Sequence, residues 1–147
     1  MPNRWEQMWQ AQYELQQQIP PLGRTPYDLR GEERIQFFKD QILALENELH
    51  AEVLGEMGWK PWATSRHFNR EAVAHELIDV FHFFLNLCMA AEMGPAEFYR
   101  LYMEKNEINR RRQTNGYDGV EGKCKDCGRA LDDPQTLCTA EVHAEAQ

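Results

Sequence analysis

The sequence lacks an uninterrupted apolar run approaching the roughly 20 residues that a membrane-spanning helix needs. Its first ten residues, MPNRWEQMWQ, also lack the apolar core of a signal peptide. We therefore expect a cytoplasmic protein without a membrane partner.

Basic residues are scarce. The chain has 16 Lys and Arg against 24 Asp and Glu, for a net charge of −8. Proteins that bind nucleic acids usually carry a basic surface, so we expect no nucleic-acid partner. A small phosphorylated substrate is not excluded, because a bound cation can bridge carboxylates to phosphate.

Cysteines are few in this sequence. The four cysteines are Cys88, Cys124, Cys127 and Cys138. In the cytosol they are thiols or metal ligands rather than disulfides. Cys88 lies in an apolar segment, where a core thiol is expected.

The sequence also lacks strand-like alternation and internal repeats, which favours an all-α fold.

Helical spacing of apolar residues predicts about four main helices, packed as a bundle. We expect them over residues 4–18, 31–57, 69–91 and 96–112. Asn69 is a suitable N-cap for the third, and Pro95 suits the first turn of the fourth. The chain is long enough for one domain with a core, which we place at residues 1–117, followed by a cysteine-rich tail at 118–147.

Two pairs of acids recur at helical spacing. Glu48 and Glu52 are four residues apart, and Glu76 and Asp79 are three apart. Each pair shares one side of its helix. If the two helices face each other, four carboxylates meet in the bundle interior and need a cation, for which Mg²⁺ or Mn²⁺ is suited.

The alternative is that these acids are solvated surface residues. The residues around Glu76 and Asp79 weigh against it, because they are apolar almost all round the helix: Leu77, Ile78, Val80, Phe81, Phe83, Phe84 and Leu85. Such a helix is usually buried, and buried acids need partners. For His82, on the same stripe, a core histidine bonded to a neighbour is at least as good an account as a direct role.

Three segments resemble one family in the right order. ELIDVFHF (76–83) is similar to the E-x-x-D-x-x-H-F segment of the dimeric, all-α dUTPases, relatives of the MazG-type nucleotide pyrophosphohydrolases. ELHAE (48–52) with WKPW (59–62) resembles the family's first acidic motif and the aromatic-Lys-x-Trp after it. YMEKNEINRRRQTNGY (102–117) resembles its K-N-x-x-N-x-x-R-Q-x-x-G-Y segment.

The first helix, with Gln12 and Leu15, fits the family's Q-x-x-L opening, so the resemblance covers about residues 5–117. One departure concerns the first motif, which is usually E-x-x-E in the family. Here Leu45 stands three residues before Glu48. Either Glu48 and Glu52 act together, or the register shifts by one residue.

The resemblance implies hydrolysis of a deoxynucleoside triphosphate to the monophosphate and pyrophosphate, with two or more Mg²⁺ or Mn²⁺ ions. Glu48, Glu52, Glu76 and Asp79 would bind metal, and Glu48 or Glu52 would orient the water or take its proton. The implied substrate-binding residues are Gln12, Lys60, Trp62, Lys105, Asn109, Arg112, Gln113 and Tyr117. A basic helix C-terminus alone would explain Arg110, Arg111 and Arg112, but not the other matches.

The base is open at this stage. The family name implies dUTP, with dGTP and dCTP as other substrates of the same class. The candidate base contacts are Gln12, Trp59, Trp62 and Asn86. An amide pairs with uracil, cytosine or a purine edge, so residue type does not decide. The family also suggests a virus or phage that reshapes a nucleotide pool, which would place the protein in the host cytoplasm.

The tail carries the pattern C-x2-C-x10-C-x4-H, formed by Cys124, Cys127, Cys138 and His143. Three thiolates and an imidazole suit a structural, tetrahedral Zn²⁺ site. A disordered tail with reactive thiols accounts for the pattern equally well. The resemblance does not extend to the tail.

Two functions of other classes stay open: a non-catalytic helical interaction module stapled by zinc, and a nucleic-acid-binding knuckle protein, which the net charge opposes. We also expect self-association as a homodimer or homotetramer. The aromatic residues expected to bury a face against a second copy include Trp5, Trp9, Phe37, Phe81 and Phe98.

Overall fold

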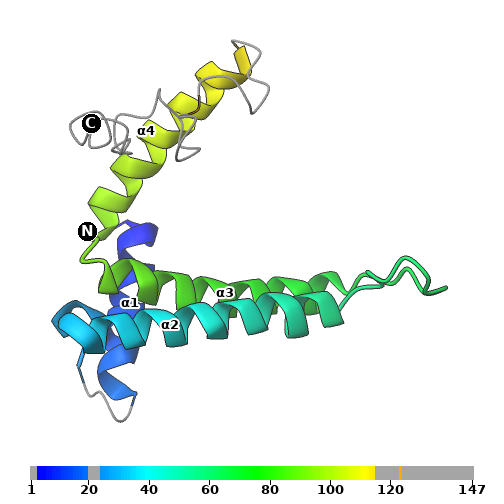
Figure 1. Ribbon diagram of the computed structural model, residues 1–147, viewed down its shortest axis with the longest axis horizontal. Helices are drawn as coiled ribbons and strands as arrows, with labels where there is room; N and C mark the ends of the chain where they lie inside the picture. The colour runs from blue at the N-terminus through cyan, green and yellow to red at the C-terminus, as the bar shows by residue number, and fades with distance from the viewer. Residues whose placement is uncertain (1–2, 20–23, 115–122, 124–147) are drawn as a thin grey trace, which may run out of the picture. The chain divides into compact units, whose positions relative to one another are not determined.

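A computed structural model describes residues 3–19, 24–114 and 123. Within these residues the chain forms helical elements and no strand, which confirms the all-α prediction (Figure 1). The elements are α1 (Arg4–Gln18), the 3₁₀ turn η1 (Pro26–Asp28), α2 (Gly31–Asn47), the π-helix η2 (Glu48–Val53), α3 (Arg70–Ala90) and α4 (Pro95–Thr114).

The chain divides into two units, Met1–Phe98 and Tyr99–Gln147. The first contains α1, α2, η2, α3 and the start of α4, and the second contains the rest of α4. The boundary that we expected after residue 117 lies outside the described residues, so the division into a domain and a tail stays a prediction.

In the first unit, α2 and α3 run side by side in opposite directions, and α1 crosses them near one end (Figure 1). The helix starts follow the sequence. The Asn3 Oδ1 accepts from the Glu6 amide at 3.0 Å, and the Glu6 carboxylate accepts from the Asn3 amide at 2.8 Å, which closes a capping box. The Asn69 Oδ1 accepts from the Ala72 amide, which confirms Asn69 as an N-cap.

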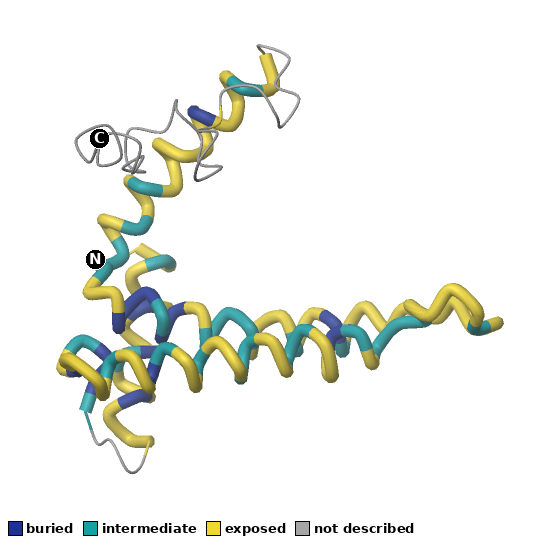
Figure 2. The backbone as a smooth tube through the Cα atoms, in the orientation of Figure 1, coloured by how far each residue is buried: buried dark blue, intermediate teal, exposed yellow. Residues whose placement is uncertain are grey.

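Buried residues gather where α1 crosses α2 and α3 (Figure 2). One cluster consists of Trp9, Leu85, Cys88 and Met89, with Trp5, Tyr13, Tyr27, Phe81, Met93 and Phe98 packed against it. A second consists of Leu29, Phe37 and Ala90, flanked by Phe38. The five aromatic residues expected to face a second copy pack in or against these clusters. Trp9 and Phe37 are buried, whereas Trp5, Phe81 and Phe98 stay partly exposed, so the expected interface stays a prediction.

Cys88 is a buried free thiol, as expected, and burial raises its pKa to about 11. A thiol with so high a pKa carries almost no reactive thiolate at neutral pH.

In contrast to our expectation, α3 is not buried all round. The side chains of Leu77, Ile78 and Phe84 are exposed. Among the described helices, α3 alone is long and apolar enough to cross a membrane, a criterion that a soluble core helix also meets. Our expectation of no such segment rested on uninterrupted apolar runs, and charged residues interrupt this one.

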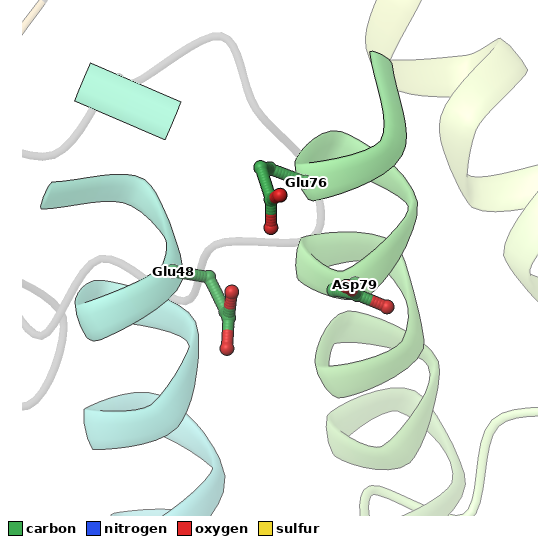
Figure 3. A group of neighbouring side chains, drawn as sticks. All are labelled: Glu48, Glu76 and Asp79. Carbon is green, nitrogen blue, oxygen red and sulfur yellow. The ribbon is translucent and has the colours of Figure 1, made fainter. Parts of the chain in front are cut away.

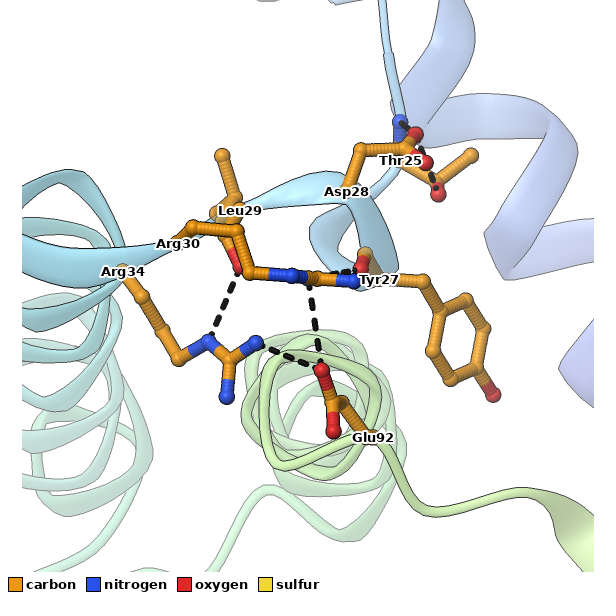
Figure 4. Close-up of polar contacts among 7 residues, drawn as sticks. All are labelled: Thr25, Tyr27, Asp28, Leu29, Arg30, Arg34 and Glu92. Carbon is orange, nitrogen blue, oxygen red and sulfur yellow. Dashed lines mark hydrogen bonds and ion pairs between the residues drawn. The ribbon is translucent and has the colours of Figure 1, made fainter.

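The end of α3 is fixed to the start of α2 by two arginines (Figure 4). The Arg34 guanidinium donates to the Leu29 carbonyl at 2.9 Å and to the Glu92 carboxylate at 2.6 Å. Arg30 pairs with the same carboxylate at 3.3 Å. Glu92 has a positive φ of 62°, which few side chains adopt. These contacts hold the α3–α4 turn and thereby fix the register of α3 against α2.

Candidate functional site

Three carboxylates converge where η2 packs against α3. Glu48 comes from η2, and Glu76 and Asp79 come from α3 (Figure 3). One oxygen of each lies within 4.8 Å of the others, which is close enough to hold one metal ion. Glu48 and Glu76 are half-buried, and Asp79 is exposed. The acids therefore line an accessible site at the helix interface rather than a closed interior.

Among the described residues, no lysine or arginine forms an ion pair with Glu48, Glu76 or Asp79. Burial, followed by the neighbouring charges of Asp79, Glu52 and Glu76, raises the pKa of Glu48. Crowded carboxylate oxygens are the donors that hard cations such as Mg²⁺ and Mn²⁺ prefer. The donor set therefore fits the metal that the sequence led us to expect.

Glu52 differs from the other three acids. It is exposed and does not belong to the group within 4.8 Å, although its charge acts on Glu48. The structure thus brings together three of the four predicted metal ligands. The segment that carries both residues is a π-helix, whereas the apolar spacing predicted one continuous α-helix over 31–57. Such wide turns often occur at functional sites.

The WKPW segment lies in a loop that closes on itself beyond the acids. The Gly58 amide donates to the His67 carbonyl at 2.8 Å, next to a β-bridge between Met57 and Phe68. A side chain at Gly58 would not fit, because a Cβ there would lie 2.4 Å from the Ser65 carbonyl oxygen. The glycine therefore permits the close approach that shapes the loop.

Arg66 bridges several backbone carbonyls of the loop, and no sequence pattern singled it out. Its guanidinium donates to the carbonyl oxygens of Lys60, Pro61, Ala63 and Ser65 at 2.6–3.2 Å. Two predicted substrate-binding residues, Lys60 and Trp62, lie on the loop that these bonds fix, and both are exposed. A cation that binds nearby backbone oxygens through both terminal nitrogens could have been found only from the structure.

Gln12, the third predicted contact in the first unit, is buried and bonded to the candidate Asn86. Its Nε2 donates to the Asn86 Oδ1 at 2.7 Å, and the Asn86 Nδ2 donates to the Gln41 Oε1 at 2.8 Å. Gln12 also lines a cavity of about 320 Å³ between α1 and α3. His82 is half-buried and lines the same cavity, beside Ile78 and Phe81.

The remaining predicted contacts lie elsewhere. Lys105, Asn109, Arg112 and Gln113 lie on α4 in the second unit, at spacings that share one helix face. Tyr117 and the predicted zinc ligands, Cys124, Cys127, Cys138 and His143, lie outside the described residues. Their roles stay predictions.

Comparison with known proteins identifies relatives. A family model described as dUTPase matches residues 4–98. The dCTP pyrophosphatase of Enterobacteria phage T4 is 44% identical over 45 residues, which cover 31% of this chain and 26% of the relative. The dCTP pyrophosphatase of Enterobacteria phage LZ5 is 36% identical over 72 residues, 40% of this chain and 41% of the relative. The matches thus span less than half the length of these relatives. No solved structure matches the chain.

Proposed function

We propose a function for this chain on the premise that it belongs to the dUTPase family, whose model matches it from residue 4 to residue 98. The proposed reaction is hydrolysis of a deoxynucleoside triphosphate to its monophosphate and pyrophosphate. Water adds across the bond between the α- and β-phosphates, and pyrophosphate leaves. The observation that carries the proposal is the convergence of Glu48, Glu76 and Asp79 in a chain of this family.

Glu48, Glu76 and Asp79 would hold Mg²⁺ or Mn²⁺, and Glu52, whose charge acts on Glu48, would serve a further ion. Such ions, when bound, neutralise phosphate charge and make a bound water more acidic. Glu52 is exposed beside the group, so its carboxylate is positioned to orient the attacking water or accept its proton. Glu48 shares this candidate role.

The chain supplies further groups for the substrate. Lys60 and Trp62 lie on the loop closed by Arg66 and offer a charge for phosphate and a ring for stacking. On α4, Lys105 and Arg112 would meet phosphate, and Asn109 and Gln113 would bond sugar or base. Tyr117 completes the proposed set.

The family and the named relatives point to pyrimidines as the first substrates to test. The family description supports dUTP, and the names of the two phage relatives support dCTP. Phage relatives also support a place of action in the host cytoplasm. Self-association, and the absence of nucleic-acid and membrane partners, belong to the proposal as well.

The test is pyrophosphate release from each dNTP in turn, with Mg²⁺, with Mn²⁺ and with EDTA. We expect release that needs the metal and falls at least about 100-fold in Glu76→Ala, because metal-assisted and electrostatic stabilisation is lost. Glu46→Ala is the matched control: Glu46 is an exposed acid of α2 outside the group, and its variant should keep wild-type activity.

Absence of release from every nucleotide, with a folded protein, would overturn the proposal and favour the zinc-stapled interaction module. Equal loss of activity in the Glu46 and Glu76 variants would show instead that net charge, rather than the site, controls turnover.

A further inference from the structure

A row of three amide side chains connects α2, α3 and α1 in the first unit. Gln41 lies on α2, Asn86 on α3 and Gln12 on α1. The row runs in one direction: the Gln12 Nε2 donates to the Asn86 Oδ1, and the Asn86 Nδ2 donates to the Gln41 Oε1. We call these residues the amide row.

The row is well protected. Gln12 is 4% exposed and Asn86 is 3% exposed, so their polar groups cannot exchange partners with bulk water without cost. In this row the two bonds between buried amides are both formed, and breaking either would leave a buried donor or acceptor without a partner. Gln41 is half-buried at the outer end of the row. Its acceptor oxygen therefore sets which way Asn86 points, and Asn86 sets which way Gln12 points.

One polar atom is left over at the inner end. The Gln12 Oε1 accepts no hydrogen bond from the described residues. Among these residues, every fully buried side-chain nitrogen or oxygen has a hydrogen-bond partner, so an unpaired oxygen must be at least slightly exposed. The Oε1 is therefore accessible, and Gln12 lines the 320 Å³ cavity with Leu15, His82 and Leu85. The Gln12 carbonyl oxygen, an acceptor, thus belongs to a residue that lines a mainly apolar space and remains available for a ligand.

The cavity and the acids lie on neighbouring faces of α3, about 100° apart around the helix. Ile78, which lines the cavity, is the residue before Asp79. Gln41 and Asn86 each lie seven residues along their helices from Glu48 and Asp79, about 10 Å or two helical turns. A nucleotide whose phosphates lie at the acids can thus extend its base toward the cavity.

We propose that Gln41 and Asn86 are positioning residues, which hold Gln12 with its carbonyl oxygen toward the base and so select a base that presents an N–H donor there. This inference rests on the proposed function. In this proposal the Gln12 Oε1 lies at position 4 of the pyrimidine, where cytosine carries an amino donor and uracil a carbonyl acceptor, so that the amide row favours dCTP over dUTP. An Oε1 placed at position 3 would instead favour dUTP, because N3 carries a hydrogen in uracil and none in cytosine.

The test changes the outer end of the row, which does not touch the base. Gln41→Glu keeps an acceptor for Asn86 and should leave the ratio of kcat/KM for dCTP to that for dUTP within about twofold of wild type. Gln41→Lys offers a donor, which turns Asn86 and then Gln12 around. It should shift the ratio toward dUTP by about tenfold, the equivalent of one hydrogen bond.

Two controls separate polarity from other effects. Gln41→Met removes the bond without reversing it and should give a ratio between those of the Glu and Lys variants. Gln36→Lys adds the same charge at an exposed position of α2 and should leave the ratio unchanged. An unchanged ratio in Gln41→Lys, or an equal shift in Gln41→Glu, would overturn the proposal.

NMR of the side-chain amides tests the row without turnover. In the wild-type protein, the NH₂ groups of Gln12 and Asn86 should exchange with water far more slowly than that of exposed Gln17. Asn86 should lose this protection in Gln41→Met. Fast exchange of both amides in the wild type would overturn the amide row, whether or not the protein hydrolyses a dNTP. Protected amides in a protein that hydrolyses no dNTP would overturn the proposed function instead.

Discussion

The ionised form of Glu48 is disfavoured in the folded protein. Its pKa is raised by burial and by three neighbouring carboxylates. A raised carboxyl pKa in the folded state means that folding favours the protonated form, so the metal-free protein loses stability as pH rises through that pKa. Sites that bind cations commonly carry such a cost in the absence of the cation.

Glu48→Gln should therefore stabilise the metal-free protein. We expect its Tm in EDTA at pH 7 to rise by about 1–4 °C, because like-charge contacts at accessible sites cost only fractions of a kcal/mol. The gain should shrink as pH falls through the raised pKa. With Mg²⁺ or Mn²⁺ the order should reverse, because the variant loses a ligand. Glu46→Gln is the control, and a lower metal-free Tm in Glu48→Gln would contradict this prediction.

At the scale of single residues, the sequence allowed three of the clustered acids to be predicted. It did not allow prediction of the residues that hold the amide row and the loop in place. Glu76 and Asp79 could be predicted because charged residues stand out on an apolar helix. Gln41 could not, because a glutamine on a helix is ordinary until its partner across the interface is known. Arg66 was missed for the same reason, since its partners are backbone oxygens that carry no sequence signal.

At the scale of elements, the loop between η2 and α3 depends on one close contact. Gly58 lies against the Ser65 carbonyl, where no Cβ fits, whereas a Cβ at Gly55 would meet nothing within 4 Å. The two glycines are three residues apart and contrast in the space open to a Cβ, which makes Gly55 a useful comparison for Gly58.

Gly58→Ala should destabilise the protein by about 1–3 kcal/mol, because backbone atoms must move to admit the methyl group. Gly55→Ala should be neutral or stabilising by up to about 1 kcal/mol, because alanine restricts the unfolded chain. Urea unfolding measures both. If the proposed function holds, Gly58→Ala should also raise KM, since Lys60 and Trp62 lie on the same loop. Equal stabilities of the two variants would show that the loop adapts without cost.

The helices themselves were predictable to within about two residues at most ends. Two residues singled out in the sequence account for part of this success: Asn69 caps α3, and Pro95 begins α4. The start of η2 was not predictable, because the widened turn arises where the chain packs against α3 and leaves the apolar spacing unchanged.

At the scale of the whole molecule, the first unit leaves apolar side chains uncovered on its two longest helices. The exposed residues on α2 and α3 are Ile35, Ile42, Leu43, Leu77, Ile78 and Phe84. Side chains of this kind in such number commonly mark an interface. They add to the aromatic residues that we had expected in this role, of which Trp9 and Phe37 are buried in the core.

We therefore predict that the protein self-associates, and that Leu43→Glu weakens the association. Leu43 is 63% exposed, so the substitution should leave the fold of the single chain intact. Light scattering after size-exclusion chromatography measures the mass. Gln36→Glu adds the same charge on the same helix and should keep the wild-type mass. A wild-type protein that stays monomeric at micromolar concentrations would contradict the prediction.

The π-helix η2 accounts for the unusual spacing of the two glutamates in the first acidic motif. One turn of an α-helix takes more than three residues and fewer than four. One turn of the wider π-helix takes more than four residues, so a spacing of four there resembles a spacing of three in an α-helix. Glu48 and Glu52, four apart in η2, can thus occupy the relative positions of an E-x-x-E pair in a regular helix. The departure from the family spacing then amounts to a single inserted residue absorbed locally, and relatives should be aligned at this motif by position in space rather than by residue count.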